Sequence, residues 1–253
     1  MAKKKRGSEK SRRKLLMVGP DAPFQYVEAY KSLRTNLEFL SASTGCKVIL
    51  ITSSVQEEGK SNVAINLAST MASGGKRVVL VDSDLRKGSL SRYLHLSHNR
   101  PGISNIVAGQ ATLNDALVRF KNVQFTLLPV GPLPPNPSEM LSLPAVEQMF
   151  DTLREYYDYI IVDTPPVSVV TDAAVMCRMV DGVVLVVRSG VTTIQGAQLS
   201  KKKLEAVGAR ILGVVLNGYD ARRIGRRDGY SYAYSYNYYA GDDQSEDKKA
   251  TLS

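Results

Sequence analysis

The segment 54–61, Ser-Val-Gln-Glu-Glu-Gly-Lys-Ser, holds residue types that bind phosphate. It follows the apolar run 48–51 and opens a stretch of helical character. A loop between a buried strand and a helix offers backbone N–H groups and the positive helix end to an anion. Lys60 adds a point charge, and the Ser61 hydroxyl can bind Mg²⁺. The spacing predicts a nucleotide-phosphate loop, although Ser54 replaces the usual first glycine; the alternative is a polar helix start.

Carboxylates end two further apolar runs. Asp82 and Asp84 follow the run 78–81, and Asp163 follows 159–162. A single aspartate at a strand end is usually a turn or cap residue. Two aspartates spaced two apart point the same way while strand geometry persists, so one can hold a Mg²⁺-bound water and the other accept a hydroxyl proton. Asp163 sits where Mg²⁺ is held opposite a phosphate loop, and the set predicts phosphoryl transfer.

Alternating strands and helices must position these groups. Short runs rich in Val, Ile and Leu predict buried parallel strands at 47–52, 77–82, 125–129, 159–163, 182–187 and 211–216. Helices are expected near 24–43, 60–73, 112–119, 138–156, 171–179 and 193–207. The order predicts an α/β fold, a doubly wound and mostly parallel sheet flanked by helices. Because ligands bind beyond the carboxyl ends of such strands, we expect residues 59–61, Asp82, Asp84 and Asp163 to converge on one edge.

Composition narrows the class of protein. The 253 residues, 43% apolar, suffice for one domain with a sizeable core, and no apolar run approaches the roughly 20 residues of a membrane span. Cys46 and Cys177 are the two cysteines, so no disulfide framework is expected and a reduced cytoplasm fits. Residues 1–14 carry +7 of the net charge of +9, which leaves +2 elsewhere and argues against a broad nucleic-acid-binding face.

A tyrosine segment, 230–239, lies near the carboxyl end. It holds six of the chain's 13 tyrosines: Tyr230, Tyr232, Tyr234, Tyr236, Tyr238 and Tyr239. The intervening residues are small or polar, and glycines and acidic residues flank the segment. The pattern favours a flexible set of phosphoacceptors over an edge strand; a generic aromatic low-complexity tail is the alternative.

With these motifs taken together, the chain resembles the bacterial tyrosine kinases of capsule and exopolysaccharide systems, which have a P-loop fold. The resemblance covers nearly the whole chain. The segment 28–36 is similar to the family's oligomerisation helix, 54–61 to its Walker A loop, 79–86 to its Walker A′, 160–166 to its Walker B, and 230–239 to its autophosphorylated cluster.

The resemblance implies an ATP-dependent autokinase that modifies its own tyrosines in trans and regulates polysaccharide synthesis and export. Lys60 would bind the β- and γ-phosphates, Ser61, Asp82 and Asp163 would hold Mg²⁺, and Asp84 would orient or deprotonate the tyrosine hydroxyl. The residues expected to contact ATP are Glu58, Gly59, Lys60, Ser61, Asn62, Arg86 and Asn217. Arg86 is equally a candidate for a structural ion pair, and Asn217 for a turn residue.

The resemblance also implies an organisation and partners. We expect a basic arm at 1–20, a kinase domain at 21–220 with an oligomerisation helix at 21–43, and a tail at 221–253. Glu28, Lys31 and Arg34 would hold a homo-oligomer, with a ring as the expected form. A separate transmembrane activator would recruit the cytoplasmic chain to the inner face of the cell membrane, and a cognate tyrosine phosphatase would reverse the modification. No nucleic-acid partner is expected.

Three positions depart from related patterns. Glu57 stands where the family often has glycine, so Glu57 and Glu58 are expected to point outward. Lys31 stands where arginine is common, and lysine lacks the bidentate geometry of arginine. Partitioning and cell-division-site ATPases share the fold but carry a signature lysine where this chain has Val55. A switch ATPase of that kind is the main alternative function, and a nucleic-acid-associated NTPase using the basic arm is a third.

Overall fold

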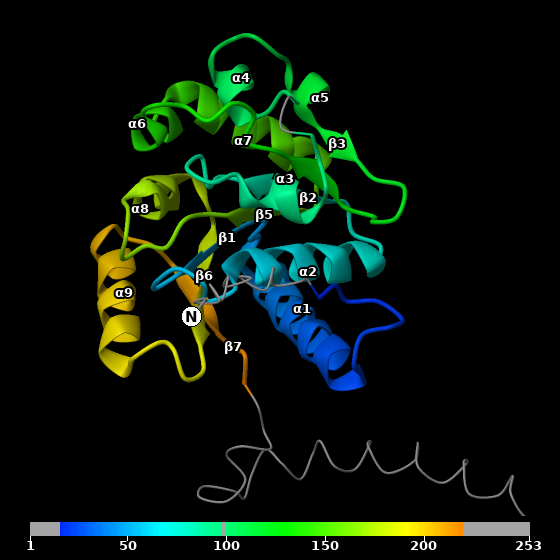
Figure 1. The fold of residues 1–253 in the computed structure, drawn as a ribbon, viewed down its shortest axis with the longest axis vertical. Helices are drawn as coiled ribbons and strands as arrows, with labels where there is room; N and C mark the ends of the chain where they lie inside the picture. Colours follow the sequence, from blue (N-terminus) through cyan, green and yellow to red (C-terminus); the bar gives the residue numbers. More distant parts are fainter. Residues whose placement is uncertain (1–15, 98–99, 220–253) are drawn as a thin grey trace, which may run out of the picture.

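A seven-stranded sheet forms the centre of the computed structural model, which describes residues 16–97 and 100–219 (Figure 1). The strands lie in the order β3-β4-β2-β5-β1-β6-β7, and every pair is parallel except the antiparallel pair β3 and β4. Their bounds are β1 Val48–Ser53, β2 Val78–Asp82, β3 Val118–Arg119, β4 Thr126–Leu128, β5 Tyr159–Asp163, β6 Gly182–Arg188 and β7 Ile211–Asn217. The mostly parallel α/β sheet confirms the expected fold class.

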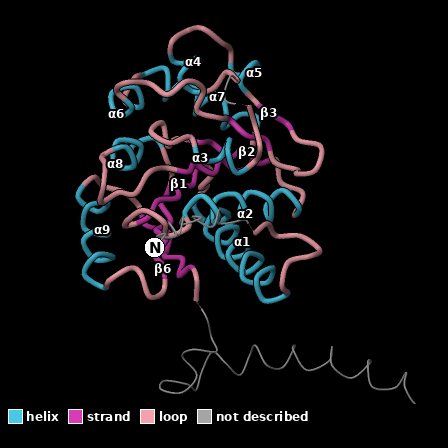
Figure 2. The backbone as a smooth tube through the Cα atoms, in the orientation of Figure 1, coloured by secondary structure: helices cyan, strands magenta, loops and turns pink. Residues whose placement is uncertain are grey.

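Helices cover both faces of the sheet (Figure 2). Their bounds are α1 Phe24–Thr44, α2 Lys60–Ser73, α3 Ser89–Tyr93, α4 Ile103–Val107, α5 Leu113–Ala116, α6 Pro137–Leu141, α7 Pro144–Tyr156, α8 Asp172–Met176, the 3₁₀ helix η1 Cys177–Met179, and α9 Ile194–Ala206. One core cluster joins the sheet to α1, α2 and α3, and the other joins it to α4 through α9. Strands β1, β2 and β5 are buried along their whole length, which explains their unbroken apolar sequences.

The predicted helix at 112–119 is wrong in its second half. Thr112 caps the short helix α5, which ends at Ala116. Val118 then lies in β3 and pairs with Leu127 of β4. Sequence periodicity did not indicate this edge strand. Cross-strand pairing therefore overrides helix propensity there.

The predicted helix at 138–156 is two helices. Helix α6 ends at Leu141 and α7 begins at Pro144. Proline restricts the residue before it to extended backbone, and Leu143 has φ −71° and ψ 145°. The predicted helix at 171–179 similarly ends in the 3₁₀ turn η1.

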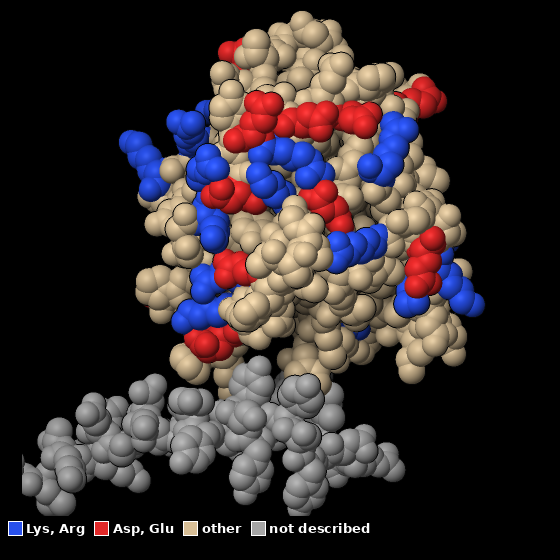
Figure 3. Space-filling model, turned by 180° about the vertical axis from the view of Figure 1, so that it is seen from behind, with Lys and Arg blue, Asp and Glu red and all other residues tan. Residues whose placement is uncertain are grey.

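Charged side chains of both signs share the molecular surface. On the face drawn in Figure 3, Lys and Arg are interspersed with Asp and Glu, so no continuous basic surface covers it. Within the described part of the chain, none of the helices has both the length and the apolar character needed to cross a membrane.

Candidate nucleotide site

The phosphate loop connects β1 to α2 at the carboxyl edge of the sheet. Gly59 precedes α2 with φ +92°, in the left-handed region that favours glycine. A Cβ atom at this position would lie 2.0 Å from Nδ2 of Asn217, so a larger residue would have to displace that side chain. Lys60 and Ser61 are the first residues of α2, where backbone N–H groups have no intrahelical partner. The loop therefore has the local geometry of an anion site.

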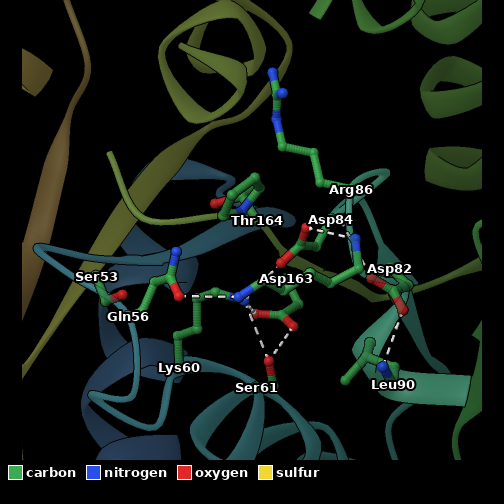
Figure 4. A network of polar contacts seen from close by, with 12 residues as sticks. Ser53, Gln56, Lys60, Ser61, Asp82, Asp84, Arg86, Leu90, Asp163 and Thr164 are labelled. Atoms are coloured by element: carbon green, nitrogen blue, oxygen red, sulfur yellow. Dashed lines mark hydrogen bonds and ion pairs between the residues drawn. The ribbon is translucent and has the colours of Figure 1, made fainter. Parts of the chain in front are cut away.

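Lys60, Ser61, Asp84 and Asp163 point toward one another (Figure 4). The Lys60 Nζ atom lies 3.4 Å from Oδ2 of Asp84, 3.4 Å from Oδ1 of Asp163 and 3.2 Å from Oγ of Ser61. The Ser61 hydroxyl donates to Oδ2 of Asp163 over 2.6 Å. All four residues are buried, so the predicted convergence of these strand ends is confirmed.

Asp82 occupies a different environment from Asp84. Asp82 is the register partner of Asp163 across β2 and β5. Its Oδ1 accepts the Asp84 N–H over 3.2 Å, and its Oδ2 accepts the Leu90 N–H over 3.0 Å. Both oxygens of Asp82 are thus engaged by backbone N–H groups, whereas Asp84 directs Oδ2 toward Lys60 and accepts the Lys87 N–H through Oδ1 over 3.2 Å. Leu90, at the start of α3, was not anticipated as part of this arrangement, because its contribution is a backbone amide rather than a recognisable side chain.

Burial dominates the electrostatics of the site. It raises the pKa of Asp82 well above its ordinary value, and the nearby Asp163 charge raises that pKa further. Burial also raises the pKa of Asp163, against the opposing effects of Lys60 and Ser61. Burial alone would lower the pKa of Lys60, but the carboxylates of Asp163, Asp84 and Asp82 outweigh it and the pKa is raised. The lysine is accordingly held as a cation, and it lies among three acidic groups, more than one cation can pair with.

The donor set suits Mg²⁺ bound together with phosphate. Ser61 and Asp163 offer hard oxygen ligands, and the excess of carboxylates favours a second cation. Among the described residues, no group of three or more His, Cys, Asp or Glu side chains is arranged to hold a metal by itself. Mg²⁺ usually binds through one or two protein oxygens, several waters and substrate phosphates rather than in an all-protein cage. The residues therefore fit a Mg²⁺ ion that arrives with a nucleotide.

Arg86 points away from this cluster (Figure 4). Its Nε and Nη2 atoms donate to the two oxygens of Asp172 over 2.9 and 2.8 Å. Nη2 also lies 3.1 Å from the Ser138 hydroxyl, which itself donates to Asp172 over 2.6 Å. Of the two roles considered for Arg86, the structure displays the structural ion pair. Its partner Asp172 lies 86 residues away, and no local pattern indicates the pairing.

The side chains of Asn62 and Asn217 are both engaged within the protein. Oδ1 of Asn62 accepts the hydroxyls of Tyr26 and Tyr30 over 2.9 and 3.3 Å. Nδ2 of Asn217 donates to the Glu58 carbonyl over 2.8 Å, which joins the end of β7 to the phosphate loop. These are structural contacts made by two residues that we expected to contact ATP.

The expected outward orientation of Glu58 is wrong. Glu57 is exposed, but Glu58 is 1% exposed. The Glu58 carboxylate accepts the Val55 N–H through Oε2 over 2.9 Å and bonds the Thr192 hydroxyl through Oε1. Because the carboxylate has hydrogen-bond partners inside the fold, it can be buried without an outward-facing side chain. Thr192 follows β6, far from the recognised motifs, and went unnoticed in the sequence.

The residues expected to support oligomerisation make contacts within the chain. Lys31 pairs with Glu28 over 2.7 Å on the exposed face of α1. Nη1 of Arg34 donates to the Thr70 carbonyl near the end of α2 over 3.0 Å. The six tyrosines expected as phosphoacceptors lie outside the described residues, as does most of the basic arm.

Comparison with known proteins identifies the family. A family model described as an AAA domain matches residues 46–211. The tyrosine-protein kinase YwqD of Bacillus subtilis is 34% identical over 230 residues, which are 91% of this chain and 94% of YwqD. This chain belongs to the bacterial tyrosine kinases. The tyrosine-protein kinase Etk of Escherichia coli K12 is 38% identical over 83% of this chain, but the chain spans only 28% of the length of Etk.

Solved structures agree with that family membership. The kinase domain of the E. coli tyrosine kinase Etk is 36% identical, with a TM-score of 0.75 over 81% of this bacterial tyrosine kinase and 79% of the Etk chain. The septum site-determining protein MinD of Pyrococcus horikoshii, complexed with Mg-ADP, is 24% identical with a TM-score of 0.59 over 70% of this chain and 72% of MinD. At that identity the likeness to MinD shows the shared P-loop fold alone.

Proposed function

We propose that this chain transfers the γ-phosphoryl group of ATP to tyrosines of its own segment 230–239, presented by a neighbouring copy. The observation that carries the proposal is the meeting of Lys60, Ser61, Asp84 and Asp163 at one buried edge of the sheet. The tyrosine segment provides six acceptors in the same chain. By its family, the activity would regulate polysaccharide synthesis and export.

Each group has a distinct role in this proposal. Lys60 binds the β- and γ-phosphates, and the backbone of Glu58, Gly59 and Asn62 contributes N–H groups at the start of α2. Ser61 and Asp163, with Asp82 behind them, would hold Mg²⁺, which when bound neutralises phosphate charge. This scheme keeps Arg86 and Asn217 at the border of the site rather than in contact with the transferred group.

Asp84 is the proposed base for the acceptor hydroxyl. Tyrosine has an unperturbed pKa of about 10 and is protonated near neutrality, so its attack on phosphorus benefits from a positioned carboxylate. One Asp84 oxygen, Oδ2, faces Lys60 while Oδ1 accepts the Lys87 N–H, whereas both oxygens of Asp82 accept backbone N–H groups. Asp82 supports catalysis by fixing the backbone that presents Asp84.

Oligomerisation would bring the acceptor tyrosines of one copy to the nucleotide site of another. Phosphorylation of those tyrosines would then favour dissociation of the copies. Glu28, Lys31 and Arg34 on α1 are the proposed contacts between copies, and a separate transmembrane activator would recruit the assembly to the membrane. Each phosphotyrosine adds about −1.5 to −2 charges, so several of them repel one another and the acidic end of the tail. A tyrosine phosphatase would then return the chain to its assembling state.

Incubation of the full chain with ATP and Mg²⁺, followed by mass spectrometry of the carboxyl-terminal peptide, tests the activity. The activator's cytoplasmic fragment is added in a parallel reaction. Phosphate on several tyrosines of 230–239 is expected in the wild type. ADP release with nucleotide-dependent polymerisation and an unmodified tail would overturn the proposal in favour of a switch ATPase. Measuring oligomeric mass before and after phosphorylation tests the assembly cycle separately.

A further inference from the structure

Three side chains outside the recognised motifs hold the phosphate loop from one side. They are Arg188 at the end of β6, Thr192 before α9, and Asn217 at the end of β7, here called the phosphate-loop clamp. The loop is separated from the clamp by about half of the chain, so no local sequence pattern connects them.

Two members of the clamp bind backbone carbonyls of the loop. Nη1 of Arg188 donates to the Glu57 carbonyl over 2.9 Å, and Nδ2 of Asn217 donates to the Glu58 carbonyl over 2.8 Å. Holding these carbonyls fixes how the two peptide groups are oriented around the loop. Glu57 itself has φ +66°, a left-handed conformation that costs a non-glycine residue free energy and persists only where surrounding contacts impose it.

Thr192 links the clamp to the beginning of the loop. Its Oγ1 accepts the Arg188 N–H over 2.7 Å and donates to Oε1 of Glu58. The other oxygen of that carboxylate accepts the Val55 N–H over 2.9 Å. One hydroxyl therefore connects the β6–α9 loop, through Glu58, to Val55 near the start of the phosphate loop.

We propose that Thr192 is a positioning residue for nucleotide binding, acting through Glu58. This inference rests on the proposed nucleotide site. With Thr192 in place, Glu58 holds the loop in the conformation that leaves the amides at the start of α2 free for phosphate. Without the hydroxyl, the buried carboxylate loses a donor and the binding-ready conformation becomes a smaller fraction of the population. Apparent affinity falls in proportion to that fraction.

The test uses the full chain with and without the activator's cytoplasmic fragment, a fluorescent ADP analogue with Mg²⁺, and three variants. Thr192→Val removes the hydroxyl with little change of shape, and Thr192→Ser retains it. Thr70→Val is the matched control, since Thr70 is a buried threonine whose hydroxyl donates to the Asn66 carbonyl over 2.7 Å at the far end of α2. Thermal unfolding of nucleotide-free protein reports any general loss of stability.

The expected result is an affinity about tenfold weaker for Thr192→Val, the effect of losing roughly one buried hydrogen bond. Thr192→Ser restores binding to within about twofold on the same scale, and Thr70→Val binds as the wild type does. Hydrogen exchange in the nucleotide-free protein should be faster in the peptide covering 55–59 for Thr192→Val only.

Three results would overturn the inference. In the first, Thr192→Val binds as tightly as the wild type or more tightly, which would mean that the clamp is neutral or that Glu58 competes with phosphate. In the second, Thr70→Val loses as much affinity as Thr192→Val. In the third, wild-type protein with the activator fragment does not bind the analogue at all, which would also remove the proposed nucleotide site. Wild-type binding with an unaffected Thr192→Val variant removes the positioning role alone.

Discussion

Buried acidic side chains at two places near the same edge of the sheet, Asp172 and the Lys60 cluster, have very different hydrogen-bond partners. Asp172 is fully buried and receives two nitrogens of Arg86 and the Ser138 hydroxyl at 2.6–2.9 Å. In the nucleotide site, Lys60 lies 3.4 Å from each of two carboxylates, and Asp82 adds a third acidic group. A forked guanidinium matches a carboxylate geometrically, whereas an ammonium among several carboxylates leaves acceptors available.

The difference separates a structural ion pair from a ligand site. The Arg86–Asp172 pair is complete within the chain and needs nothing further. The Lys60 cluster has long contacts and an excess of acidic groups, which Mg²⁺ and phosphate together would complement. The type of cation and the number and length of its contacts distinguish the two.

The largest effect on activity is expected from Lys60→Met, which removes the cation of the Lys60 cluster. Tyrosine phosphorylation should fall by at least about 100-fold, because the variant loses a preorganised charge that stabilises the transferring group. Lys202→Met, at an exposed position on α9, is the matched control. Quantitative phosphotyrosine mass spectrometry checks both. Substantial phosphorylation in the Lys60 variant would show that the cluster is not the site of transfer.

Asp172→Asn should act on stability instead. Breaking the pair with Arg86 is expected to lower the free energy of unfolding by about 2 kcal/mol, less than the roughly 3–5 kcal/mol typical of fully buried pairs, since Arg86 is partly exposed. Urea unfolding measures the change, with the exposed Asp151→Asn as control. The comparison fails if this variant keeps wild-type stability but loses phosphorylation at saturating ATP.

The acidic groups of the Lys60 cluster should also make the free energy of unfolding depend on pH. The pKa values of Asp82 and Asp163 are raised in the folded state above the ordinary 3.8, so the folded protein binds these protons more tightly than the unfolded chain. Their stabilising contribution is complete below pH 3.8 and declines as pH rises toward the folded values. Each group contributes a slope of at most about 1.4 kcal/mol per pH unit.

Urea unfolding between about pH 5 and 8, without Mg²⁺ or nucleotide, measures this decline above the unperturbed carboxyl range. Asp82→Asn should make the dependence less steep, whatever it does to absolute stability. An identical slope in the variant would mean that Asp82 releases its proton below this range.

The smallest effect on folding is expected at the exposed pair of α1. Lys31→Ala should change the free energy of unfolding by less than about 0.5 kcal/mol, because an exposed pair three residues apart on a helix is weak. If α1 joins neighbouring copies, the same variant should nevertheless lower the oligomeric mass measured by light scattering. Unchanged mass and unchanged stability together would remove Lys31 from the proposed interface.

Much of the candidate site was predictable because its signals are local. A strand, loop and helix in sequence order determine that Gly59, Lys60 and Ser61 stand at a helix start. Asp82 and Asp163 follow apolar strands, and parallel strands bring their carboxyl ends to one edge. These relations need only chain order and the geometry of parallel sheets, which is also why the fold class was predictable.

The failures involve partners distant in sequence. Sequence periodicity gave no sign that Val118 would pair with Leu127, so a helix was extended through a strand. The ion pair of Arg86 with Asp172 could not be predicted without knowing how α8 packs. Glu58 was expected to point outward because an acidic side chain beside the phosphate loop would weaken nucleotide binding, but the fold buries it against the Thr192 hydroxyl and the Val55 N–H.

The sequence by itself determined the class of fold, the identity of the phosphate-binding and acidic groups, and the family resemblance, because these depend on local order and residue type. Only the tertiary structure decided which buried charges are satisfied and which remain available. That distinction depends on register, such as Asp82 beside Asp163, and on contacts closing across up to 159 residues, such as Asn217 with Glu58. Hydrogen bonds act over about 3 Å, so they are fixed only when packing brings the distant segments together.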